Sequence, residues 1–342
     1  MSNPLHEPMS EPVIFDLRGK RVYVAGHAGM VGAAIVRRLG REQCKIITAA
    51  RSELDLRHSE AVDRFMAEAK PDAVFMAAGK VGGIRANSAF PADFIADNLA
   101  IARNTIHSAY RCGVGKLLYL GSSCIYPRLA PQPMTPDMLL SGPLEPTNQW
   151  YAVAKIAGIK LCEAYRLQHG ADFVSVMPSN LYGPGDNYHP DDSHVPAALL
   201  RRFHEAKIAG SPTVTVWGTG RPRREFLAVD DLADACVFVM KCYSSLEFLN
   251  VGSGEDISIA DFARVIAGVV GFRGKIEFDP SRPDGAPQKL LDVSRINALG
   301  WRAQTALREG LQRMYAEFVA HYPELQRQAD STAARDAIAP QR

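Results

Sequence analysis

The feature that most constrains the fold is a glycine-rich stretch between an apolar run and a helical run. The strand-like residues Arg21–Ala25 pass into G-H-A-G-M-V-G over residues 26–32, and a helical run over 33–40 follows. Glycines at this junction allow a tight turn and let a pyrophosphate approach backbone N–H groups at the helix N-terminus. The spacing is G-x-x-G-x-x-G, unlike the usual G-x-G-x-x-G. The residues expected to hold a dinucleotide here are Gly26, His27, Gly29, Met30, Val31 and Gly32. A glycine-rich turn without a ligand is the alternative.

Strand-like and helical runs alternate along most of the chain. Strands are expected over residues 45–48, 73–76, 116–121 and 173–177, and helices over 59–69, 92–112 and 151–169. This alternation predicts an α/β fold with a Rossmann-type doubly wound parallel sheet. From residue 186 the alternation weakens, which predicts a smaller C-terminal α/β substrate lobe. The predicted division is a flexible extension (1–17), an NADP-binding domain (18–185 and about 226–256), a substrate lobe (186–225 and 257–322, with its last helix ending at 321) and a flexible tail (323–342).

Composition excludes several classes of protein. The net charge of +2 gives no general basic field for nucleic acid, and no 18-residue apolar run is present to cross a membrane. The first 17 residues lack the order of a signal peptide, and the six cysteines show no C-x-x-C pairing. We therefore expect a cytoplasmic protein that acts on a small molecule, without a bound metal.

The end of the second strand bears on the choice of cofactor. A site that prefers NAD usually has Asp or Glu there to bind the ribose 2′-hydroxyl, whereas an Arg accepts the 2′-phosphate of NADP. Here the strand is followed by Ala49-Ala50-Arg51. Arg51 favours NADP, NAD is not excluded, and a solvated surface arginine is the alternative.

Tyr151 and Lys155 have the spacing of a proton donor and its partner on one helix face. An ammonium beside a tyrosine is expected to lower the phenol pKa from about 10. The loop after the fourth strand adds Ser122 and Cys124, whose side chains point the same way if the segment is extended. Ser122 would bind a carbonyl oxygen that Tyr151 protonates, and Cys124 as thiolate would take a proton from carbon. His194, which titrates near neutrality, is a second proton carrier, although a surface role is the alternative.

The motifs together resemble the extended short-chain dehydrogenase/reductases, and more narrowly the GDP-L-fucose synthase family. They include L-G-S-S-C-I-Y-P over 120–127, Y-A-V-A-K-I-A-G over 151–158, and N-L-Y-G-P over 180–184. W-G-T-G over 217–220 and S-R-P-D-G over 281–285 extend the resemblance into the second half. The similarity runs from about residue 21 to residue 315.

The resemblance implies 3,5-epimerisation and NADPH-dependent 4-reduction of GDP-4-keto-6-deoxy-D-mannose in a homodimer. Cys124 and His194 would invert C3 and C5, and Tyr151, Lys155 and Ser122 would serve the reduction. Further residues are implied at the cofactor (Pro178, Asn180, Leu181 and His194) and at the GDP-sugar (Arg202, Trp217, Arg224 and Asp284). Many family members carry basic residues at the positions of Ala28 and Ala49, so NADP binding would rest on Arg51. A related GDP-4-keto sugar, 3,6-dideoxy or heptose, and a non-catalytic NADP-binding regulator are the alternatives.

Overall fold

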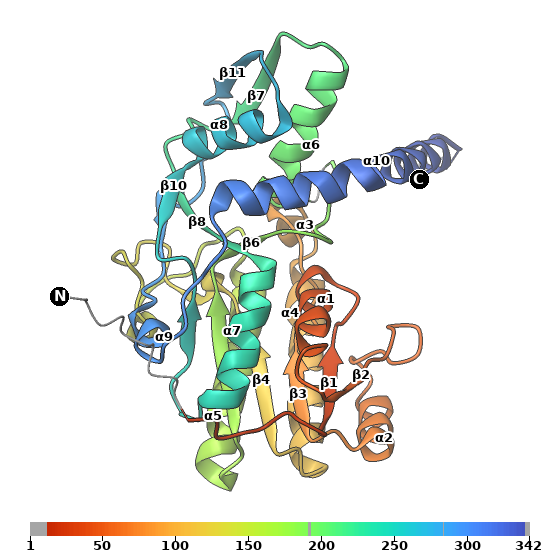
Figure 1. Cartoon of the computed structure of the whole chain (residues 1–342), viewed down its shortest axis with the longest axis vertical. Helices are drawn as coiled ribbons and strands as arrows, with labels where there is room; N and C mark the ends of the chain where they lie inside the picture. Colours follow the sequence, from red (N-terminus) through yellow and green to blue (C-terminus); the bar gives the residue numbers. More distant parts are fainter. Residues whose placement is uncertain (1–11, 191–192, 283, 339–342) are drawn as a thin grey trace, which may run out of the picture.

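The computed structural model describes residues 12–190, 193–282 and 284–338. Its largest element in this part of the chain is a six-stranded parallel sheet in the order β2-β1-β3-β4-β5-β9 (Figure 1). The order reverses between β1 and β3, where the crevice at the carboxyl ends of the strands binds ligands in such sheets. The predicted Rossmann-type fold is confirmed. The strands are β1 Arg21–Ala25, β2 Lys45–Ile47, β3 Ala73–Met76, β4 Lys116–Leu120, β5 Phe173–Pro178 and β9 Leu249–Val251.

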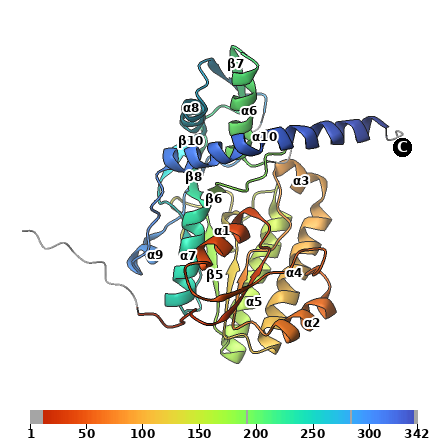
Figure 2. The same ribbon diagram turned by 45° about the vertical axis from the view of Figure 1, so that its right-hand side comes forward.

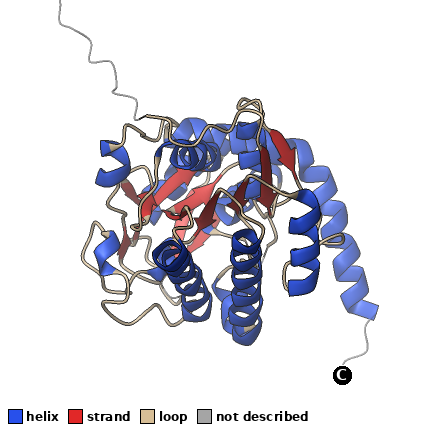
Figure 3. Cartoon of the chain, turned by 90° about the horizontal axis from the view of Figure 1, so that it is seen from below, coloured by secondary structure: helices blue, strands red, loops and turns tan. Residues whose placement is uncertain are grey.

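Helices cover both faces of this sheet (Figure 3). On one face α4 packs against α5 and α2, and on the other α1 packs against α7. The strands between them are almost entirely apolar because both faces are covered. These helices are α1 Met30–Leu39, α2 Ser59–Ala69, α4 Pro91–Arg111, α5 Gln149–His169 and α7 Val229–Cys242. A short helix, α3 Ile84–Ala89, and two 3-10 turns, Ser123–Ile125 and Pro136–Met138, lie in the connections.

A smaller lobe lies beyond the carboxyl ends of the sheet (Figure 1). It has its own apolar core, which includes Phe203, Phe262 and Phe318. Its helices are α6 Val195–Ile208, α8 Ile259–Val270 and α10 Leu307–Ile338, and its two-stranded parallel sheet pairs β7 Thr213–Trp217 with β11 Lys275–Asp279. Between lobe and main sheet, β8 Arg223–Ala228 pairs with β6 Asn180–Tyr182, β10 Asp256–Ser258 and β12 Gln288–Lys289.

Both predicted flexible ends need correction where the structure describes them. Leu17 is fully buried and Phe15 packs against the main core, while the N–H groups of Ile14 and Phe15 donate to the Lys241 carbonyl at 2.9 and 3.1 Å. Residues 12–17 are therefore part of the domain. Residues 1–11 and 339–342 lie outside the described residues.

The last helix does not end at residue 321. Helix α10 continues through Pro323 to Ile338, and Figure 2 shows its far end projecting away from the lobe. The segment after Pro323 contains several Ala, Arg and Gln residues, which favour helix, but it lacks an apolar period that would have predicted one. The predicted tail over 323–338 is thus a helix.

The predicted boundary of the substrate lobe is also too simple. Short helix α9 Ser294–Ala298 packs against β9, and Leu291, Val293, Ile296 and Trp301 belong to the core of the main sheet. The boundary is wrong because the segment that contains α9 returns from the smaller lobe to pack on β9, the edge strand of the main sheet. The alternation of strands and helices in the sequence does not show this return. None of the helices in the described ranges is long and apolar enough to span a membrane.

Candidate active site

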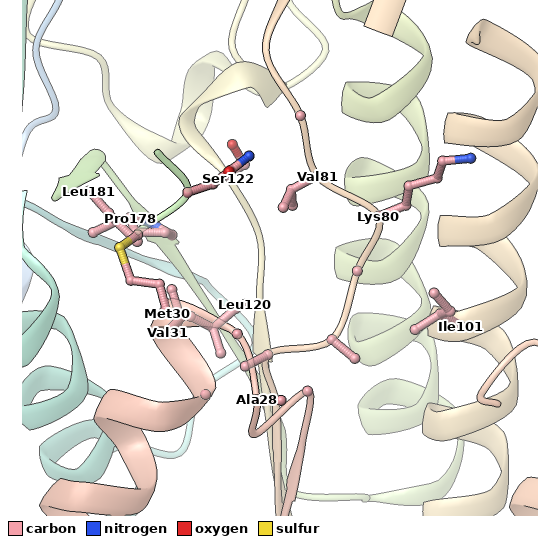
Figure 4. A pocket seen from close by; sticks show the side chains of 18 of the residues that line it. Ala28, Met30, Val31, Lys80, Val81, Ile101, Leu120, Ser122, Pro178 and Leu181 are labelled. Atoms are coloured by element: carbon pink, nitrogen blue, oxygen red, sulfur yellow. The ribbon is translucent and has the colours of Figure 1, made fainter. Parts of the chain in front are cut away.

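A cavity of about 660 Å³ opens at the carboxyl ends of β1, β3, β4 and β5. Figure 4 shows Met30, Pro178 and Leu181 gathered on one side of it, with Lys80 and Ile101 opposite. A volume of this size suits a bound cofactor or substrate. Every residue predicted to hold the cofactor lines this one cavity: Gly26, His27, Gly29, Met30, Val31, Gly32, Arg51, Ser122, Tyr151, Lys155, Pro178, Asn180, Leu181 and His194.

The glycine-rich turn forms the floor of the cavity. Gly26 has φ +81°, and a Cβ there would lie 2.7 Å from the Cα of Ala78. A Cβ on Gly32 would lie 2.1 Å from the Gly26 carbonyl oxygen. Gly29 is the N-cap of α1 and supplies no side chain to the first N–H groups of the helix. These groups are therefore available to a phosphate, so this cradle fits the pyrophosphate of a dinucleotide.

Arg51 lines the cavity next to Ala28 and Ala49. A second arginine on the wall, Arg57, is held by carboxylates, with contacts of 2.7 Å to Asp55 and 3.2 Å to Asp97. Arg57 is thus neutralised within the protein. Arg51 is exposed and no carboxylate of the described residues forms a salt bridge with it, so it is the better placed cation for a 2′-phosphate.

Tyr151 and Lys155 extend from the first turns of α5. A Cβ on Gly158 would lie 2.3 Å from the Tyr119 ring, so this glycine lets α5 approach β4 closely. The Lys155 ammonium donates to the Leu120 carbonyl at 2.8 Å and lies 5.7 Å from the centre of the Tyr151 ring. The Ser122 side chain lies on the same cavity wall and lowers the pKa of Tyr151. The bond to Leu120 holds Lys155 at the cavity wall beside Tyr151.

The predicted lowering of the Tyr151 pKa is wrong for this site. Burial raises the pKa of Tyr151 well above its ordinary value, with Cys124 acting in the same direction and Ser122 opposing it. Burial also lowers the pKa of Lys155 to about 8. The physical reason is that desolvation penalises the charged form of each group. Tyr151 is therefore protonated at neutral pH, as a proton donor must be.

Cys124 lies in a different local conformation from the one predicted. Residues Ser123–Ile125 form a 3-10 turn, and the Ser122 side chain accepts a hydrogen bond from the Cys124 N–H at 3.4 Å. The extended geometry that would align the two side chains is therefore absent. Cys124 is 6% exposed and does not line the cavity, whereas its neighbours Ser122 and Ser123 do. Burial raises the pKa of the thiol, and Ser122 lowers it.

His194 is the N-cap residue of α6 and lines the cavity. Its side chain makes no cap hydrogen bond. Partial desolvation at the cavity wall lowers the pKa of His194 below its ordinary value. The imidazole is thus neutral at pH 7 and is able to accept a proton.

The family model described as NAD dependent epimerase/dehydratase family matches residues 22–252. The chain belongs to this family. It is 55% identical over 299 residues to GDP-L-fucose synthase 1 of Arabidopsis thaliana, covering 87% of this chain and 93% of the relative. The predicted resemblance to the GDP-L-fucose synthases is confirmed.

Two solved structures of this family share the fold. A GDP-L-fucose synthetase from Naegleria fowleri bound to NADP is 26% identical with a TM-score of 0.83, over 93% of this chain and 99% of that one. A GDP-6-OMe-4-keto-L-xylo-heptose reductase from C. jejuni is 35% identical with a TM-score of 0.83, over 89% and 98%.

The residues that the family resemblance placed at the GDP-sugar divide into two groups. Arg224 lines the cavity. Arg202, Trp217 and Asp284 lie outside it, in the smaller lobe. The Arg202 guanidinium lies 5.3 Å from the centre of the Trp217 ring, and Asp284 accepts hydrogen bonds from the Thr219 N–H and hydroxyl at 2.7 and 2.8 Å.

Arg224 connects the two groups. Its Nη2 lies 3.4 Å from where a Cβ on Gly285 would stand, next to Asp284 in the chain. Arg224 thus adjoins both the cavity and the segment that carries Asp284.

Two charged residues at this family site were not predicted. Glu225 is fully buried and accepts hydrogen bonds from the N–H groups of Gly254 and Leu291 at 2.8 and 2.9 Å, and burial raises its pKa to about 7. Lys289 pairs in register with Arg224, and burial lowers the pKa of its ammonium. No local pattern in the sequence marks either residue, because the groups around each come from other strands. In the described residues no group of three or more His, Cys, Asp or Glu could hold a metal ion.

Proposed function

We propose that this protein converts GDP-4-keto-6-deoxy-D-mannose to GDP-L-fucose by 3,5-epimerisation and NADPH-dependent 4-reduction. The observation that carries the proposal is the convergence of Ser122, Tyr151, Lys155 and His194 on the wall of one cavity, with Cys124 in the 3-10 turn that Ser122 caps. A group suited to reduction and a group suited to proton abstraction thus both adjoin Ser122. The 55% identity to a GDP-L-fucose synthase supports this choice of substrate.

In the epimerisation, Cys124 and His194 act as the base and acid pair at C3 and C5. Both carbons adjoin the 4-ketone, so loss of a proton gives an enolate whose charge lies on the ketone oxygen. Hydrogen bonds from Tyr151 and Ser122 stabilise that oxygen. The proton removed from carbon goes to one member of the pair, and the other returns a proton to the opposite face of the ring.

In the reduction, Tyr151 gives its proton to the C4 oxygen. NADPH, when bound, supplies the hydride to C4. Tyr151 is protonated at neutral pH because burial raises its pKa, so it begins the step in the required state. Lys155, 5.7 Å from the centre of the Tyr151 ring in the same cavity, would tune Tyr151 and contact the nicotinamide ribose. Ser122 orients the oxygen.

The rest of the substrate is assigned to the smaller lobe and its border. Arg224 at the cavity edge suits the diphosphate, since an arginine binds phosphate oxygens through paired N–H groups. Trp217 is largely exposed and offers a face to a base or ribose. Arg202 and Asp284 complete the GDP-sugar site in this proposal.

The assembly and compartment also belong to the proposal. Helices α4 and α5 pair and carry exposed apolar side chains, among them Leu99, Trp150 and Val153. Two copies joined through these helices would form a homodimer with a four-helix interface. Sedimentation of wild type and Val153→Glu tests it, because a dimer that becomes a monomer in the variant is expected and a monomeric wild type contradicts it. All six cysteines are free thiols, which suits the cytoplasm.

The test of the function is incubation of the protein with GDP-4-keto-6-deoxymannose in D2O, with NADPH and NADH in parallel. The expected result is oxidation of NADPH and a GDP-fucose product that carries deuterium at C3 and C5 by NMR. Faster turnover of a GDP-4-keto heptose or of a 3,6-dideoxy sugar would show that the proposed substrate is wrong and that the related sugar is the substrate. Cofactor binding without oxidation of NADPH by any of these sugars would overturn the enzymatic proposal in favour of a regulator.

A further inference from the structure

The Trp217 indole presents an exposed ring from a fixed position in the smaller lobe. Trp217 is 59% exposed and is the last residue of β7. It pairs in register with Asp279 of β11, and the N–H of the next residue, Gly218, donates to the Asp279 carbonyl at 2.8 Å. An exposed ring whose backbone is held in this way suits the stacking of a flat ligand.

Two guanidinium groups lie over this ring. Arg202 of α6 is 5.3 Å from the ring centre and also donates to the Thr215 carbonyl at 2.8 Å. Arg282, in the loop after β11, is 5.1 Å from the ring centre. A guanidinium that stacks on an aromatic face keeps the N–H groups at its edge for other partners. A base stacked on Trp217 would therefore meet the edge of a guanidinium over the same ring.

The N–H groups of Arg282 are not used within the protein. The carboxylate that pairs with this guanidinium is Asp279, whose Oδ2 lies 3.8 Å from Nε, which is longer than a hydrogen bond. The other oxygen of Asp279 accepts from the Ser281 N–H and hydroxyl at 3.0 and 2.6 Å. In the part of the chain that the structure describes, the Arg282 guanidinium donates no hydrogen bond, whereas Arg202 already binds Thr215.

The loop after β11 also connects the Trp217 ring to the arginine proposed for the diphosphate. Asp284 in this loop accepts from the N–H and hydroxyl of Thr219, two residues after Trp217, at 2.7 and 2.8 Å. The next residue is Gly285, and a Cβ there would lie 3.4 Å from Arg224 Nη2. The ring and Arg224 are thus held at neighbouring positions, as the base and the diphosphate of one nucleotide require.

The three common bases differ in what they offer to an arginine. Guanine has two acceptors, O6 and N7, side by side on one edge, and paired N–H groups of arginine match them. Adenine keeps N7 but has an amino donor in place of O6, which opposes a second donor. The carbonyl oxygens of uracil are not adjacent, so they accept only one N–H at a time. A free guanidinium edge beside a stacked base therefore favours guanine.

We propose that Arg282 selects the base of the substrate: with guanine stacked on Trp217, its paired N–H groups bind O6 and N7. The inference rests on the proposed GDP-sugar substrate, because guanine is the base of that substrate. Binding of nucleotides tests it without sugar and without NADPH, so the two proposals fail in different ways.

The experiment is calorimetric titration of GDP, inosine diphosphate, ADP and UDP into wild type, Arg282→Met and Arg282→Lys. Inosine diphosphate keeps O6 and N7 and lacks only the amino group of guanine. We expect wild type to bind GDP and inosine diphosphate within about threefold of each other, and ADP and UDP about 10- to 100-fold more weakly. In Arg282→Met the ratio of GDP to ADP affinity should fall below about threefold. Arg282→Lys should also lose the preference, because an ammonium has no paired fork.

Arg273→Met is the matched control, because Arg273 is an exposed arginine of the same lobe, just after α8. It should keep the wild-type ratio of affinities. Arg202→Met tests the second guanidinium over the ring, and it should weaken GDP and ADP by similar factors. A GDP preference lost in Arg202→Met but kept in Arg282→Met would assign the selection to Arg202 and overturn the proposal.

Three further results would overturn it. One is a wild type that binds GDP no better than ADP. Another is an equal loss of affinity for GDP and ADP in Arg282→Met, which would assign Arg282 to stacking or charge alone. The third is inosine diphosphate bound as weakly as ADP, which would show that the amino group is recognised instead. Selective GDP binding that Arg282→Met abolishes, in a protein that does not convert the proposed sugar, would uphold this inference and overturn the proposed function.

Discussion

Replacing Arg51 with alanine should remove most of the preference for NADPH over NADH. Arg51 and Arg57 are both exposed cations on the cavity wall, but Arg57 is already neutralised by Asp55 and Asp97. A hydrogen bond to a charged group contributes about 1.5 to 3 kcal/mol, and the lower end applies here because Arg51 is exposed. That value corresponds to about a tenfold loss of NADPH affinity, with NADH affinity unchanged because NADH lacks the 2′-phosphate.

The assay is titration of each cofactor by fluorescence in the absence of sugar. Arg41→Ala is the matched control, since Arg41 is also an exposed arginine but does not line the cavity. The reciprocal change, Ala28→Arg, should raise the NADPH preference by a similar factor. An NADPH to NADH affinity ratio that falls by less than about threefold in Arg51→Ala would refute the assignment.

Two further substitutions test the floor and wall of the cavity. Gly32→Ala should lower the free energy of unfolding by about 1 to 3 kcal/mol, because its Cβ would lie 2.1 Å from the Gly26 carbonyl oxygen. In Gly29→Ala the Cβ would lie 3.6 Å from the same oxygen, so the free energy of unfolding should fall by less than half as much. Equal decreases of the free energy of unfolding, measured by urea denaturation, would contradict this geometry. For Lys155, whose folded pKa of about 8 lies below its ordinary value, the penalty of the buried ammonium is fully present below pH 8 and fades as pH rises towards the unfolded value. The unfolding free energy of wild type minus Lys155→Met should therefore rise by about 2 to 3 kcal/mol between pH 7 and pH 10, and a flat difference would contradict it.

The sequence predicts the sheet and the cavity well because both depend on local patterns. Glycines 26, 29 and 32 are needed where a strand meets a helix, and that need is visible in their spacing. The pair Tyr151 and Lys155 is likewise fixed by the helical repeat. Such features are determined by residues a few positions apart, so a reading of the chain finds them.

Features set by distant contacts could not be predicted. Strand β12 has only two residues and exists because β8 lies beside it, so the pairing of Lys289 with Arg224 has no local signal. The 3-10 turn at Cys124 depends on a side chain, Ser122, that caps it. The direction of the Tyr151 pKa shift depends on how deeply the surrounding elements bury the phenol. Spacing reveals which residues are neighbours along a helix, but not the solvent around them.

The central claim is that one site performs two separable stages, with Cys124 and Tyr151 in different roles. The most direct measurement follows NADPH oxidation and deuterium uptake at C3 and C5 of the same sugar in D2O, in Tyr151→Phe and in Cys124→Ser. We predict that Tyr151→Phe loses NADPH oxidation by about 100-fold or more while exchange continues. Cys124→Ser should lose exchange yet still reduce some sugar without epimerisation. Loss of exchange in Tyr151→Phe with retained oxidation, or the same losses in both variants, would contradict the division of roles.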